Sequence, residues 1–117
     1  MNNLDEFYAS VGSTASEVVG RLGGSPALVV RFLGKFSADG SYKQLCEALD
    51  AGDTQTAFRA AHTMKGIAAN LGLQYLFNKA SEVTEYLRAG DADSAKTALP
   101  DLTAEYERCC KLIAELN

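Results

Sequence analysis

The chain has 117 residues, of which 47% are hydrophobic and 22% charged, with a formal net charge of −4, as in a single globular domain. The acidic balance, without any Lys/Arg-rich run, argues against general nucleic-acid binding. No apolar run approaches the roughly 20 residues needed to cross a bilayer. The N-terminus lacks the basic and apolar regions of a signal peptide. Three cysteines, an odd number, indicate a reducing compartment. We expect a cytoplasmic protein that binds neither nucleic acid nor membrane.

The first 24 residues predict two short helices. Apolar residues at helical spacing run up to Gly12, which interrupts the pattern. Ser13 is a plausible N-cap for the second helix, and the two glycines at 23 and 24 end it. We expect residues 1–24 to form a helical extension of the main fold.

The next two helices have clear start signals. Ser25 followed by Pro26 supplies an N-cap and a proline in the first turn, and this helix should end near residues 39–40. Ser41 should cap a shorter helix that Gly52 closes.

The central helix should begin after Asp53, run to about Leu71 and end at Gly72. A new apolar series with spacings of three and four starts at once at Leu73. Such a short connection forces the two helices to be antiparallel neighbours.

The last helix follows a tight turn at Gly90 and Asp91. Its apolar spacing continues in phase across Pro100, which predicts one kinked helix, with two separate helices as the alternative. No segment alternates with period two. The pattern predicts an all-α fold, an antiparallel up-and-down four-helix bundle over about residues 25–117, with the N-terminal helices and the Ser41 helix as additions.

The only histidine lies near the middle of the central helix. At about 100° per residue, His62 points away from the apolar stripe; Gly66 falls on the same outward side, and Lys65 flanks it. A mid-helix glycine costs about 0.5–1 kcal/mol relative to alanine. Either another helix backbone approaches there, or a side chain at 66 would block the imidazole. We favour the second interpretation: an accessible nucleophile or proton carrier beside a fixed positive charge.

Other chemistry has little support in the sequence. One histidine with scattered cysteines does not supply the three or four ligands of a zinc site, and no glycine-rich loop matches a nucleotide-binding pattern. Neutral imidazole is a competent nucleophile at cellular pH, and Lys65 is placed to offset the charge of a phosphoryl group on His62. The residue types fit phosphoryl acceptance, whereas none of them supplies the phosphoryl group.

The run His-Thr-Met-Lys-Gly at 62–66, followed by Asn-Leu-Gly at 70–72, resembles the signature of histidine-containing phosphotransfer (HPt) domains of phosphorelays. Further similar stretches, at 22–24, 49–53 and 87–91, extend the resemblance over about residues 20–117. The resemblance implies a four-helix bundle whose histidine carries a phosphoryl group, here His62.

The resemblance also implies the partners. The phosphoryl group would come from the aspartyl phosphate of a receiver domain, in a response regulator or a hybrid histidine kinase, and would pass to another receiver. The carrier would need no nucleotide or cofactor of its own, and the receiver would supply Mg²⁺. Lys65 would correspond to the lysine that stabilises charge, and Gly66 to the glycine that gives access.

One position departs from the family pattern. HPt domains often place a glutamine on the next helix, close enough to hydrogen-bond the phosphohistidine. Ungapped extension from His62 puts Thr84 at about that place, with Arg88 one turn further on. We therefore predict that Thr84 and Arg88 lie beside the phosphate.

Helical geometry also predicts a docking surface for a partner. The residues that share the outward arc with His62 are Gln55, Phe58, Arg59, Gly66 and Ala69. Phe58 should be partly exposed as an anchor for the partner, or alternatively packs against the Ser41 helix. The acidic residues Glu82 and Glu85 are interpreted as a solvated face.

Two other functions compete with the phosphocarrier. A helical adaptor that is never phosphorylated would keep binding its partner after His62→Gln. An enzyme with His62 as a general base would need a concave pocket beside that residue. We expect a monomer, and the starting Met1 and compact end at Asn117 favour a free-standing protein.

Overall fold

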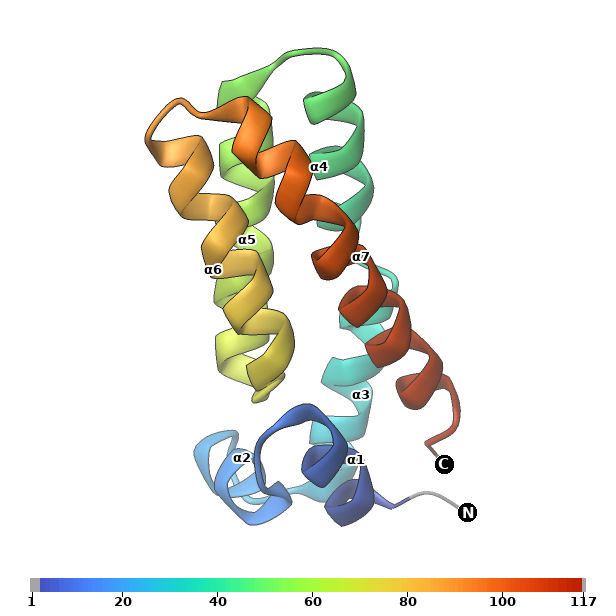
Figure 1. Ribbon diagram of the computed structural model, residues 1–117. Helices are drawn as coiled ribbons and strands as arrows, with labels where there is room; N and C mark the ends of the chain where they lie inside the picture. Colours follow the sequence, from blue (N-terminus) through green and yellow to red (C-terminus); the bar gives the residue numbers. More distant parts are fainter. Residues whose placement is uncertain (1–2, 117) are drawn as a thin grey trace.

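The computed structural model describes residues 3–116; Met1, Asn2 and Asn117, which the predicted domain includes, lie outside the described residues. Every regular element in residues 3–116 is a helix, which confirms the all-α prediction. In chain order the helices are α1 (Leu4–Val11), α2 (Ala15–Arg21), α3 (Pro26–Ser37), α4 (Ser41–Asp50), α5 (Thr54–Leu71), α6 (Gln74–Arg88) and α7 (Ala92–Ala114) (Figure 1).

Short polar side chains start most of these helices. In five of them, the residue before the first turn accepts a hydrogen bond from the backbone N–H three positions later, which satisfies a donor that the helix leaves unpaired. These N-cap residues are Asn3, Thr14, Ser25, Asp53 and Asp91. At Asp53, hydrogen bonds from Thr56 hold the pKa of the carboxyl below its usual value.

Two predicted caps are wrong. The second helix is capped by Thr14, one residue after Ser13. Ser41 is the first residue of α4 rather than its cap, and the Asp39 carboxylate accepts the hydrogen bond of the Ser41 N–H at 2.9 Å. In both cases a neighbouring polar side chain is better placed to accept from the first turn.

Pro100 lies inside α7, which is one continuous helix from Ala92 to Ala114. The choice of one helix over two is therefore confirmed. A bend at this position stays a prediction, based on the missing N–H of proline.

α5 is the central helix of the molecule. It packs along α4 on one side and α6 on the other, and α6 packs along α7 (Figure 1). α3 contacts α5 and α7 less extensively, and residues 38–40 connect it to α4 (Figure 1). The Ser41 helix, predicted as an addition, is therefore a principal neighbour of α5, and this part of the prediction is wrong.

The N-terminal segment packs against the C-terminal end of α5. The Tyr8 hydroxyl donates to the Leu71 carbonyl oxygen at 2.7 Å, in a buried position. The Arg21 guanidinium donates to the carbonyl oxygens of Ala69 and Asn70 at 3.2 and 3.1 Å. Because the last carbonyls of a helix have no partner within it, α1 and α2 complete the end of α5.

Gly72 allows this close packing. Its φ of 71° is in the left-handed region, as expected of a glycine that ends a helix. A Cβ atom here would clash with Val18 and would come within 3.3 Å of the side chains of Ser13 and Tyr8. The glycine is therefore required both by the turn and by the approach of α1 and α2.

Candidate functional site

His62 is exposed near the middle of α5, as predicted. Its imidazole stacks on the ring of Phe58, one turn earlier, with centroids 5.8 Å apart and planes inclined by 16°. The Arg88 guanidinium of α6 lies 5.0 Å from the Phe58 centroid. The stack therefore gives the imidazole a defined orientation and connects it to α6.

Lys65 lies on the α6 side of His62. Its side chain is 26% exposed, and its Nζ is 4.0 Å from Oε2 of Glu85. The same carboxylate accepts hydrogen bonds from Nε of Arg88 at 3.1 and 3.3 Å. One acidic side chain therefore contacts the two cations next to the histidine.

Gly66 is exposed, and a Cβ atom built on it would meet nothing within 4 Å. The alternative that another helix backbone requires this glycine therefore has no support. The open space lies one helical turn from His62 on the same side, which is the arrangement expected if the glycine keeps the imidazole accessible.

Thr84 does not belong to this surface. Its side chain is fully buried, and its hydroxyl donates to the Ala80 carbonyl oxygen of its own helix at 2.7 Å. The prediction that Thr84 lies beside a phosphate on His62 is therefore wrong. The second predicted residue, Arg88, is exposed and reaches the site through Phe58.

The predicted docking residues lie on α5 as expected from its helical period. Gln55, Arg59 and Ala69 are exposed, and Phe58 is half-buried. The partial exposure of Phe58 is thus confirmed. Its contact with Arg88 places the ring on the α6 side of α5, which does not support the alternative of packing against the Ser41 helix.

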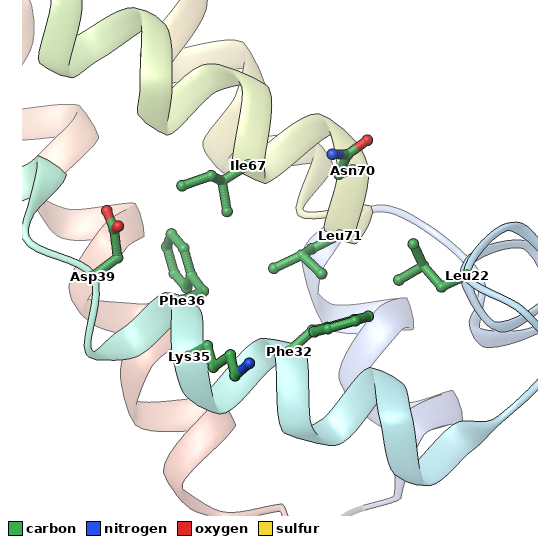
Figure 2. A pocket seen from close by; sticks show the side chains of 8 residues that line it. All are labelled: Leu22, Phe32, Lys35, Phe36, Asp39, Ile67, Asn70 and Leu71. Atoms are coloured by element: carbon green, nitrogen blue, oxygen red, sulfur yellow. The ribbon is translucent and has the colours of Figure 1, made fainter.

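A hollow of about 430 Å³ opens further along α5, toward its C-terminal end. Figure 2 shows its largely apolar lining, contributed by α3 and α5, by Leu22 just after α2 and by Asp39 just after α3. The lining residues are Leu22, Phe32, Lys35, Phe36, Asp39, Ile67, Asn70 and Leu71. Sequence reasoning missed this hollow because three separate helices form it; the apolar residues Phe32 and Ile67 were the available signal.

Two other properties concern residues 3–116 as a whole. No helix in this range is long and apolar enough to cross a membrane. Within the same range, no group of three or more His, Cys, Asp or Glu side chains is placed to hold a metal ion.

Comparison with protein families gives one match. Residues 36–111, more than half of the chain, match the family model described as the Hpt domain. The chain belongs to the Hpt domain family. The match confirms the resemblance inferred from the motif around His62. No curated protein and no solved structure matches the chain significantly.

The matched part of this Hpt domain begins near the end of α3, at Phe36, and extends into α7. It therefore contains His62 and the residues around it, whereas α1 and α2 lie outside it. Hpt domains are phosphocarrier modules rather than kinases, and they interact with receiver domains. The chain therefore takes part in phosphorelay signalling.

Proposed function

We propose that this Hpt domain is a phosphorelay intermediate in which His62 accepts a phosphoryl group from the aspartyl phosphate of one receiver domain and passes it to another. The observation that supports this most is the exposed imidazole, stacked on Phe58, with open space at Gly66 and Lys65 on its flank. A nucleophile for transfer between proteins needs an approach path of this kind.

The chemistry uses the lone pair of an imidazole nitrogen. It attacks phosphorus, the bond between phosphorus and the aspartyl oxygen breaks, and the receiver aspartate leaves as a carboxylate. The product is a phosphorylated imidazolium, whose remaining N–H exchanges its proton with solvent. Lys65 offsets the negative charge of the phosphoryl oxygens. Transfer to the next receiver reverses these steps, so the carrier itself needs no nucleotide, and the Mg²⁺ belongs to the receiver.

The proposed docking surface is the outward face of α5. Gln55, Phe58, Arg59 and Ala69 surround the histidine on this face. The apolar hollow (Figure 2) adjoins it at the C-terminal end of the same helix. Apolar contact there would hold the receiver while its aspartate reaches His62.

We further propose that residues 1–117 act as one monomeric unit in the cytoplasm. The bundle would span about residues 25–117, with α4 among its principal helices, and residues 1–24 would be an extension that the hydrogen bonds of Tyr8 and Arg21 join to α5. Three free cysteines are consistent with a reducing compartment.

The deciding experiment is phosphoryl transfer from a phosphorylated receiver domain, followed by intact mass. The wild-type protein should gain one phosphate that is labile in acid and stable in alkali, and His62→Gln should gain none. Circular dichroism should show the same helix content for both. Equal labelling of His62→Gln would assign the acceptor to another residue. Binding of receivers without labelling of the wild type would favour the adaptor.

A further inference from the structure

We propose that the carboxylate of Glu85 competes with the phosphoryl group on His62 for Lys65, so that Glu85 sets how strongly the phosphorylated state is favoured. The inference rests on the phosphocarrier function proposed above. Glu85 is a positioning residue here, because it acts on the phosphoryl group through the lysine.

The geometry places Glu85 between the cations of the site. Oε2 is 4.0 Å from the Lys65 Nζ, and both carboxylate oxygens accept hydrogen bonds from the Arg88 Nε. Lys65 is on α5, in the turn after His62, whereas the other two residues are on α6. Without a phosphoryl group, the positive charge of Lys65 therefore has a partner on the neighbouring helix.

This partner is easily replaced. The Glu85 side chain is 57% exposed, and ion pairs in contact with water are weak. A phosphoryl group carries up to two negative charges and three acceptor oxygens, which makes it the stronger partner for an ammonium group. Phosphorylation of His62 should therefore draw Lys65 away from the carboxylate, and the remaining charge of Glu85 should oppose the phosphorylated state.

A second connection runs from Glu85 to the imidazole through Arg88. The carboxylate holds the guanidinium, which lies over the Phe58 ring, and this ring stacks on His62. The same acidic side chain therefore influences both the charge available to the phosphoryl group and the support of the imidazole.

The test compares Glu85→Gln with Glu82→Gln, an exposed glutamate on the same helix. Both variants remove one negative charge, so they match in net charge. Each variant is mixed with a known amount of phosphorylated receiver. The transfer equilibrium is then calculated from the phosphorylated fractions of the receiver and of the variant. We expect Glu85→Gln to shift it about two- to fivefold toward the phosphorylated carrier, and Glu82→Gln to leave it unchanged. Thermal unfolding verifies that both variants are folded.

A double-mutant cycle with Lys65→Gln identifies the route. If Glu85 acts through the lysine, the effect of Glu85→Gln should become smaller when Lys65 is also replaced. An effect of unchanged size would mean that Glu85 acts by direct repulsion or through Arg88, and would overturn the proposed competition for Lys65. The competition would also be overturned if Glu85→Gln and Glu82→Gln had the same transfer equilibrium while the wild-type protein is phosphorylated normally. A wild type that takes no phosphoryl group would overturn the proposed function, and this inference with it.

Discussion

Two parts of α5 differ sharply in their surroundings. The site segment, defined as residues 58–66, carries exposed or half-buried side chains on its outward face, with a ring stack and a partly exposed ion pair. The anchor segment, defined as residues 68–72, ends the helix against α1 and α2 with hydrogen bonds to three of its carbonyls and close contact at Gly72. One helix thus combines an accessible surface with a firmly packed end.

Under the proposed function, this difference separates reactivity from stability. Weak contacts around His62 would then be exchanged for contacts to a phosphoryl group or a partner at little cost. At the anchor segment, the buried hydrogen bond from Tyr8 and the close packing at Gly72 hold the helix that carries the histidine, and losing that hydrogen bond leaves a buried carbonyl unsatisfied. Substitutions at the packed positions of the anchor segment should therefore change stability, and those at the exposed positions of the site segment should change transfer.

The largest loss of stability is expected for Gly72→Ala. A Cβ atom there would clash with Val18 on a backbone of positive φ, so the free energy of unfolding should fall by about 2–4 kcal/mol. Urea denaturation measures it. Gly52→Ala is the matched control, since its φ is also positive but its Cβ would meet nothing within 4 Å. An equal loss in both variants would contradict the role of the contact with Val18.

Tyr8→Phe should have the next largest effect. It removes the hydroxyl that donates to the buried Leu71 carbonyl, and the free energy of unfolding should fall by about 1–3 kcal/mol. Denaturant unfolding should show this loss, while Tyr86→Phe, at an exposed position, should be close to neutral. A neutral Tyr8→Phe would mean that water replaces the lost donor.

Alkaline pH should destabilise the fold through two buried groups, Tyr8 of α1 and Cys109 of α7. Burial raises the pKa of Tyr8 well above its usual value of 10.0 and that of the Cys109 thiol from 9.0 to about 12. At a pH between the usual pKa of each group and its raised pKa, the folded protein keeps a proton that the unfolded chain loses. The free energy of unfolding should therefore fall as pH rises above about 9. Unfolding measured from about neutral pH to pH about 11 should show the decline. In Tyr8→Phe, the decline of stability with pH should be shallower above pH 10.0, the usual pKa of tyrosine.

The smallest change in stability, of opposite sign, is expected for Gly66→Ala. Apart from the backbone of its own helix and its chain neighbours, the added methyl meets no atom within 4 Å, and alanine should stabilise the helix by about 0.5–1 kcal/mol. Transfer to His62 should nevertheless slow, because the methyl group occupies the approach to the imidazole. Thermal unfolding and transfer rates measured together separate the two effects. Faster or unchanged transfer would exclude an access role for this glycine.

Local residue chemistry was sufficient for much of the fold. Ser25 and Asp53 start helices as predicted, and Gly72 ends one, because each acts on backbone groups within a few residues of itself. The exposure of His62 followed from the helical period alone. The importance of α4 could not be predicted in this way, since it depends on which helix packs against α5.

The neighbourhood of the histidine was harder to predict. Thr84 was assigned by counting from His62, although it follows Ala80 and Val83 on the apolar face of α6, and that position already indicated burial. The exposure of Glu85 was predicted, but its contact with Lys65 depends on the relative placement of two helices. Such contacts between helices are not encoded in the period of either one.

The stack of Phe58 on His62 also has a spectroscopic consequence. An aromatic ring shifts the NMR signals of protons held over its face, so the two imidazole C–H resonances should be displaced from their free values. Because the chain contains one histidine, both resonances belong to His62 without further assignment. Any event that turns the imidazole out of the stack should move them together. Under the proposed function, these two resonances would report both the phosphorylation of His62 and the binding of a partner beside it.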